Sequence, residues 1–212
     1  MHEPSLAQRE RAELCDLLEE LGPDAPTLDE GWTTADLAAH LVVRERDPRT
    51  GPGIVLRRGR AAALTARLQA AEKAKGYEAV VARVRSGPPW WWKLPGVDGT
   101  AGLNEFFLHH EDVRRANGRG RRVDRPDLDA ALWRLLRFVT RMQGRRVRPA
   151  GLELRTPDGG RLVVRKGPPS AVLTGAPSEL VLYLAGRRSA AELTLEGDPA
   201  AIDVVRAANL SL

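Results

Sequence analysis

Residues 104–116 read NEFFLHHEDVRRA, a run without glycine or proline that predicts a single helical segment. Within it, Glu105 and His109 are four residues apart, so their side chains lie on one face of a helix and can converge on one point. Helical bundles build metal sites in this way, from a carboxylate and an imidazole on one helix and further ligands on a facing helix. The run therefore predicts one helix of a bundle that carries two candidate metal ligands.

A further imidazole comes from residues 31–41, which read GWTTADLAAHL. Thr33 or Thr34 is expected to cap a helix that runs to about Arg46. His40 lies on that helix among apolar residues, where a polar ring needs a partner. Two histidines and one glutamate would leave a fourth coordination position open, which is typical of a catalytic or substrate-binding divalent metal, zinc first among them.

The same spacing also fits a purely structural role. An ordinary hydrogen bond within the E-x-x-x-H pair, with His40 as an unrelated core histidine, would account for it equally. His110 directly follows His109, and periodicity does not decide which of the two faces the site. Asp112 is expected either to orient a ligand histidine or to pair with Arg115 one turn along the helix.

Composition is that of a globular protein, with 212 residues, 42% hydrophobic and 29% charged, and a net charge of +5. The single cysteine, Cys15, excludes an intramolecular disulfide and a cysteine-based zinc cluster, and we expect it to be a small packing residue. The N-terminal stretch contains acidic residues and no apolar h-region, and no apolar run approaches the length of a membrane span. A cytoplasmic protein without a membrane partner is therefore expected.

Charged side chains dominate two further parts of the sequence. Asn104, Glu111 and Arg115 fall on a narrow arc of their helix that is predicted to face solvent. Arginines cluster within residues 114–122 and 141–148. A nucleic-acid partner would need such cations together with aromatic side chains on one surface, so we expect these clusters to be solvated instead.

The pattern of apolar residues changes about two thirds of the way along the chain. Helical spacing and Gly/Pro breaks predict a first helix that ends at residue 21, followed by helices at 35–46, 60–85, 101–116 and 127–143. Beyond that point, alternation and turn residues predict a β-hairpin over 152–164, strands at 170–174 and 192–196, and helices at 178–185 and 199–208. The predicted fold class is α+β and mainly helical, with a bundle over residues 1–147 and a small α+β domain over residues 148–212.

Taken together, residues 31–41 and 104–116 closely resemble the metal-binding domain of the mycothiol-dependent maleylpyruvate isomerase family, which belongs to the DinB-like four-helix bundle group. The second stretch also resembles an actinobacterial subfamily of these proteins. Carried over from the family's W-T-x-x-D-L-x-x-H and E-x-x-x-H helices, the metal ligands implied are His40, Glu105 and His109. The C-terminal part resembles the sterol-carrier-like domain that often follows the bundle, so the resemblance covers essentially the whole chain.

The resemblance implies a mycothiol-dependent transferase or isomerase that acts on a small electrophile. A zinc-bound thiol is held as its thiolate, which is the nucleophilic form. The partners implied are a small-molecule thiol and a small electrophile. The alternative is a non-catalytic metal- or ligand-binding protein that retains the fold. Trp90–Trp92, within a Pro/Gly-rich stretch, are expected to cover the metal site, to form an exposed recognition patch or, more often for such residues, to fill the seam between domains.

Overall fold

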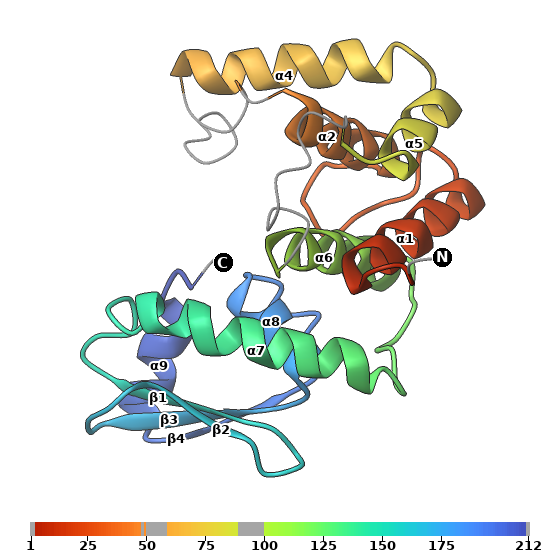
Figure 1. Cartoon of the computed structure of the whole chain (residues 1–212). Coiled ribbons are helices and arrows are strands. Elements are labelled where there is room, and N and C mark those ends of the chain that lie inside the picture. The colour runs from red at the N-terminus through yellow and green to blue at the C-terminus, as the bar shows by residue number, and fades with distance from the viewer. Residues whose placement is uncertain (1–2, 48, 50–58, 89–99, 211–212) are drawn as a thin grey trace. The chain divides into compact units, whose positions relative to one another are not determined.

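The computed structural model describes residues 3–47, 49, 59–88 and 100–210 (Figure 1). The tryptophan run at 90–92 lies outside the described residues. The chain forms two compact units, Met1–Gly120 and Arg121–Leu212. In the described ranges, every helix is too short or too polar to cross a membrane.

The first unit is helical. Its described part contains α1 (Leu6–Leu21), α2 (Thr34–Arg46), α4 (Gly59–Lys73), α5 (Tyr77–Arg85) and α6 (Thr100–Ala116). Helix α1 packs against α5 and α6, and α2 packs against α4 and α5. The apolar faces of α1, α2, α5 and α6 enclose one core, which contains Leu14, Leu18, Leu37, Leu41, Val81 and Phe106. The predicted bundle-like packing of helices is confirmed.

Helix α1 shows how local sequence sets the element boundaries. Its first turn carries a capping box, in which the Ser5 N–H donates to the Gln8 side chain at 2.8 Å and the Gln8 N–H donates to the Ser5 hydroxyl at 3.2 Å. The helix ends at Gly22, whose φ of +76° suits glycine. Cys15 is fully buried between these ends, which confirms its predicted packing role.

The helix predicted over residues 60–85 is in fact two helices. Helix α4 ends at Lys73, and α5 begins at Tyr77 after Gly76. Gly76 has φ +89° and ψ 144°, a conformation that only glycine adopts without strain, so the chain changes direction there. The prediction was wrong because it treated Gly76 as a weak point within one helix, whereas this glycine separates two.

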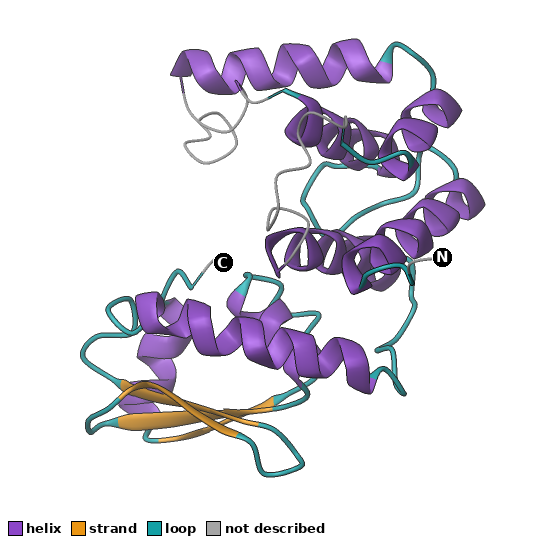
Figure 2. Cartoon of the chain, viewed as in Figure 1, coloured by secondary structure: helices purple, strands orange, loops and turns teal. Residues whose placement is uncertain are grey.

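The second unit is a four-stranded sheet with helices on one of its faces (Figure 2). It consists of α7 (Pro126–Gln143), β1 (Gly151–Arg155), β2 (Arg161–Arg165), β3 (Ser170–Thr174), α8 (Pro177–Leu184), β4 (Thr194–Gly197) and α9 (Pro199–Ala207). The strand order is β2-β1-β3-β4. The predicted hairpin is the antiparallel β1–β2 pair, whereas β1 and β3 are parallel and β3 and β4 are antiparallel.

Alternation along the strands divides the sheet into a covered and an open face. Leu152 and Leu154 of β1 and Leu173 of β3 are almost fully buried on the side of the helices. Glu153, which lies between the two buried leucines of β1, points the other way and pairs with Arg161 across the hairpin at 2.9 Å. The mainly helical α+β class is therefore confirmed.

Helix α7 belongs to the second unit. It packs against α8 and β2, and Leu128, Leu132 and Leu136 on its apolar stripe are almost fully buried. The chain therefore divides between Gly120 and Arg121, whereas the sequence predicts a boundary between residues 147 and 148. The amphipathic pattern of α7 indicates that the helix packs on something, but it does not indicate which partner it packs on.

Candidate metal centre

Helix α2 positions His40 because the helix is capped at its start and is joined to α4 by an ion pair. The Thr33 N–H donates to the Asp36 carboxylate at 3.0 Å, which begins the helix. Lys73 of α4 binds the other oxygen of Asp36 at 2.5 Å. Although burial raises the pKa of Asp36, the contacts with Lys73 and Thr33 more than offset it and hold that pKa below its usual value. His40 lies one turn further along α2 and is 8% exposed.

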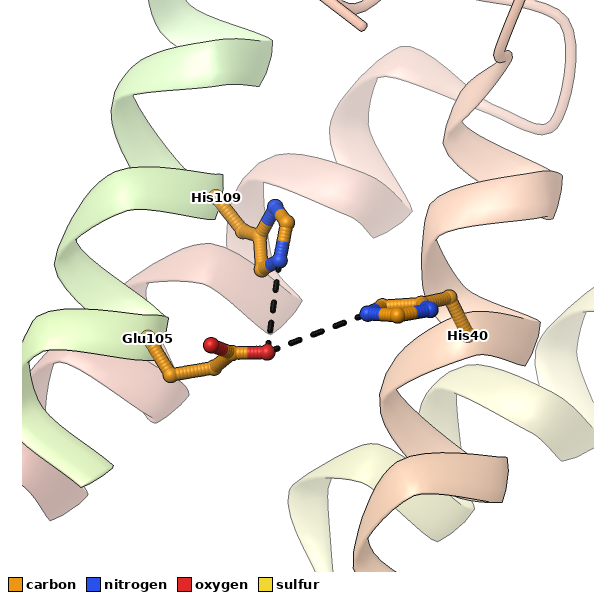
Figure 3. A group of neighbouring side chains, drawn as sticks. All are labelled: His40, Glu105 and His109. Carbon is orange, nitrogen blue, oxygen red and sulfur yellow. Dashed lines mark ion pairs between the residues drawn. The ribbon is translucent and has the colours of Figure 1, made fainter. Parts of the chain in front are cut away.

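Glu105 and His109 come from α6, and both meet His40 (Figure 3). Glu105 Oε1 lies 3.4 Å from His109 Nε2 and 3.8 Å from His40 Nε2. The two imidazole rings are 5.5 Å apart between centroids and nearly perpendicular. The structure therefore brings together the three residues that the sequence singled out.

The spacing of these atoms suits a small divalent cation. In a tetrahedral site with metal–ligand bonds of about 2.1 Å, neighbouring ligand atoms are about 3.4 Å apart. The separations of Glu105 Oε1 from the two histidine nitrogens, 3.4 and 3.8 Å, are close to this value. Two imidazole nitrogens and one carboxylate oxygen are also a donor set that zinc and similar ions accept.

Glu105 is held as a carboxylate. Burial alone would raise its pKa, but hydrogen bonds to His109 and His40 and the charge of Arg44 lower it far below the usual value. Arg44, one turn after His40 on α2, forms an ion pair with Glu105 Oε1, and its side chain is 40% exposed. The site thus combines a fixed anion with a cation that reaches solvent.

The two histidines differ in charge. Burial lowers the pKa of His109, but the carboxylates of Asp112 and Glu105 outweigh burial and raise the pKa to about 9. His40 is affected mainly by burial, which holds its pKa below the usual value. Without a metal at neutral pH, His109 is therefore an imidazolium and His40 a neutral imidazole. The edge of the Trp32 ring covers one side of His40, with 5.1 Å between centroids.

His110 faces away from this group. Its Nδ1 lies 3.2 Å from Glu10 Oε2 on α1, and both side chains are buried. Glu10, Glu13 and His110 form a second histidine–carboxylate group on the α1–α6 interface. The structure thus decides which of the adjacent histidines meets His40, a choice that periodicity left open.

One of the two contacts expected of Asp112, the contact with a histidine of the candidate site, is present. The Asp112 carboxylate lies 3.0 Å from His109 Nδ1, the nitrogen that faces away from Glu105. Arg115 donates to Glu111 at 2.8 Å, and Glu111 is 1% exposed. The prediction that Glu111 faces solvent was therefore wrong, because its pairing with arginines allows a carboxylate to be buried on that arc.

Sequence reasoning missed two residues of the site. Gln69 of α4 lies with its Nε2 atom 3.0 Å from His40 Nδ1, and nothing in the sequence distinguishes it from other polar residues of that helix. Arg44 could have been found, because it follows His40 by four residues and therefore shares its face of α2. A contact between residues 29 positions apart, such as that of Gln69 with His40, appears only in the folded chain.

Comparison with known proteins gives matches among solved structures. No protein-family model and no curated protein matches the sequence. A crystal structure of the mycothiol-dependent maleylpyruvate isomerase is similar to this chain with a TM-score of 0.60 and 18% identity. A histidine-to-alanine mutant of that isomerase gives a TM-score of 0.62 and 17% identity, and each similarity covers 91% of both chains. This chain therefore has the fold of the mycothiol-dependent maleylpyruvate isomerase over nearly its whole length.

Proposed function

We propose that this protein binds one divalent metal ion, with zinc as the first candidate, through His40, Glu105 and His109. The bound ion would activate a small-molecule thiol, such as mycothiol, in a transfer or isomerisation reaction of a small electrophile. One observation carries the proposal, namely that the ligand atoms of these three residues all lie within 4.8 Å of one another.

Two further observations support it. Among the described residues, this group supplies three ligand atoms, and three protein ligands are typical of catalytic sites that keep one position for a further ligand. The fold is that of a mycothiol-dependent isomerase, which supports a thiol as that ligand. The first observation favours catalysis over a closed structural site, and the second favours thiol chemistry over hydrolysis.

A divalent metal in such a site supplies a position where a thiol is held as its thiolate at neutral pH. The residues of the chain do the rest. Glu105 and the two histidines would hold the ion, and the side chains of His40 and His109 are largely buried. Arg44 is half-exposed beside Glu105 and offers its guanidinium to an acidic group of the thiol or of the electrophile.

The covalent step is nucleophilic addition. The sulfur atom forms a bond to an electron-poor carbon of the electrophile, and the electron pair of the attacked double bond moves to its activating group. Isomerisation follows when rotation about the resulting single bond precedes loss of the thiolate. No oxidant or reductant is consumed. An isomerisation regenerates the thiolate, whereas in a transfer the adduct keeps the sulfur and takes up one proton, equal to the proton that the thiol lost.

The first test is the metal content of the purified protein after incubation with zinc and removal of the excess. Wild type is expected to retain one zinc per chain, and His109→Ala is expected to retain less than a tenth of that. His110→Gln is the matched control, because it alters the adjacent histidine, which faces Glu10, and should keep its zinc. Metal-free wild type, or equal loss in both variants, would overturn the proposal.

The second test addresses the thiol. The cobalt(II)-loaded protein should show a new sulfur-to-cobalt absorption band in the near ultraviolet when mycothiol is added, because a coordinated thiol is a thiolate. The S-methyl derivative of mycothiol has no thiolate to offer and should give no band. A protein that binds cobalt but shows the same spectrum with and without mycothiol would retain the metal part of the proposal and lose the thiol part.

A further inference from the structure

Each candidate histidine ligand makes a side-chain hydrogen bond through the nitrogen that points away from Glu105. His109 Nδ1 lies 3.0 Å from Asp112 Oδ2, and His40 Nδ1 lies 3.0 Å from Gln69 Nε2. The two distances are equal, but one partner is a carboxylate and the other an amide. The partner on Nδ1 decides which nitrogen of the ring carries the proton, so this difference has chemical consequences.

Asp112 allows only one position for the proton that the His109 ring keeps when it binds a metal. A carboxylate only accepts hydrogen bonds, so the proton of the His109 ring that faces Asp112 stays on Nδ1. Asp112 is fully buried and lies on the same helix, three residues after His109, so it cannot easily turn away. Nε2, on the side of Glu105, is then always the nitrogen that gives up its proton to a metal.

Gln69 allows the proton of the neutral His40 ring to be on either nitrogen. In the structure its Nε2 amide faces His40 Nδ1, and because an amide NH₂ only donates, Nδ1 accepts and the proton of a neutral ring is on Nε2. That proton occupies the lone pair that a metal would need. Rotation of the amide by half a turn presents Oε1 instead, which accepts a hydrogen bond from Nδ1–H and frees Nε2.

We infer that Asp112 and Gln69 are positioning residues that make the two histidines unequal ligands. Asp112 fixes Nε2 of His109 as the nitrogen that faces the ion, whereas His40 offers its Nε2 only when the Gln69 amide turns over. The inference rests on the proposed metal site and adds the residues that position its two histidines.

The helices that carry Gln69 and His40 are held together where these two side chains meet. Gln69 lies on α4, which packs against α2, the helix of His40. Lys73, one turn further along α4, binds Asp36 of α2, so the two helices are fastened beside the contact between Gln69 and His40. Only the amide therefore has to move when the proton changes nitrogen.

The proton positions can be read directly without a metal. In the metal-free protein, side-chain ¹⁵N shifts should show a protonated Nδ1 on His109 and an unprotonated Nδ1 on His40. When zinc is added, Nδ1 of His40 should become protonated while Nδ1 of His109 stays protonated. A metal-free protein in which both Nδ1 atoms carry protons would overturn the inference.

Two isosteric substitutions should change zinc affinity in opposite directions. Asp112→Asn replaces the fixed acceptor with an amide and should weaken zinc binding by about 10- to 100-fold, the usual effect of losing such a partner. Gln69→Glu gives His40 a fixed acceptor and should strengthen binding by about 10-fold. Asp16→Asn and Gln8→Glu, both at exposed positions of α1, are the controls for charge and should leave the affinity unchanged.

The pair of variants separates positioning from packing. If Gln69 and Asp112 only filled space, both variants would leave zinc affinity as it is or lower it alike, and either result would overturn the inference. A wild-type protein that binds no zinc would contradict the proposed function instead. In that case the ¹⁵N shifts of the metal-free protein would still decide whether the two histidines are unequal.

Discussion

At the scale of single residues, His109 and Glu105 carry opposite charges inside a largely buried site. Desolvation disfavours both charges, yet the pKa of His109 is raised to about 9 and that of Glu105 is lowered, because each is stabilised by its neighbours. A metal competes with this arrangement, since it needs the His109 nitrogen that faces Glu105 to be unprotonated.

Zinc affinity should therefore depend on pH. Below pH 9, binding must displace one proton from His109, whereas His40, whose pKa is lowered, is already neutral at pH 7. The apparent affinity is expected to rise about tenfold per pH unit between pH 7 and 9 and to level off above it. Competition with a chromophoric chelator of known pH dependence measures this slope.

The stability of the metal-free protein should change in the opposite sense. A histidine whose pKa is raised on folding stabilises the folded state. That stabilisation is complete below the pKa of the unfolded chain, about 6.5, and is lost as the pH rises through the pKa of the folded protein. The urea midpoint of the metal-free protein should therefore fall between pH 6.5 and 9. A midpoint that rises over this range would show that His109 is neutral in the folded protein.

Cys15 is expected to be unreactive in the folded protein. Burial raises the pKa of its thiol to about 12, although Arg85 and Arg11 act against this, so almost no thiolate exists at pH 8. Ellman's reagent should react with native protein only at the rate of unfolding, and within seconds in concentrated urea. Rapid labelling of the native protein would show that the core around α1 opens far more easily than its burial implies.

At the scale of elements, Gly76 has a particular role because it separates α4 from α5. Its φ of +89° is open to glycine alone, and no atom lies within 4 Å of where a Cβ would stand. Gly76→Ala should therefore destabilise the protein by about 1–3 kcal/mol through backbone strain, without a steric clash. Denaturant unfolding measures the difference.

Gly120→Ala is the matched control for that substitution. Gly120 also has open space around its Cβ position, but its φ is not positive, so alanine should be tolerated there. Equal effects of the two substitutions would indicate that loss of chain flexibility, rather than strain at Gly76, determines the result.

At the scale of the whole molecule, the position of α7 predicts which fragments fold. A fragment of residues 121–212 includes α7 and the surfaces of α8 and β2 that it covers, so it should fold cooperatively. A fragment of residues 148–212 lacks that helix and exposes these apolar surfaces, so it should not fold. Circular dichroism and urea unfolding of the two fragments provide the test, and independent folding of the shorter one would favour the boundary predicted from sequence.

The sequence by itself determined much of the secondary structure. The helix end at residue 21 and the helices at 101–116 and 199–208 are predicted from local residues to within one residue at each end, because caps and breaks depend on a few neighbouring side chains. The i, i+4 spacing of Glu105 and His109 likewise follows from helix geometry alone. These features need no knowledge of distant parts of the chain.

Tertiary structure decided the rest. The parallel pairing of β1 with β3, the packing of α7 on the sheet and the contact of Gln69 with His40 join residues that are far apart in sequence. An amphipathic stripe shows that a helix needs a packing partner, and a buried polar side chain shows that it needs a hydrogen-bond partner. Neither shows which part of the chain supplies that partner. The same reason explains why His109 rather than His110 meets His40, since adjacent side chains on a helix differ only in direction until a neighbouring helix packs against one of them.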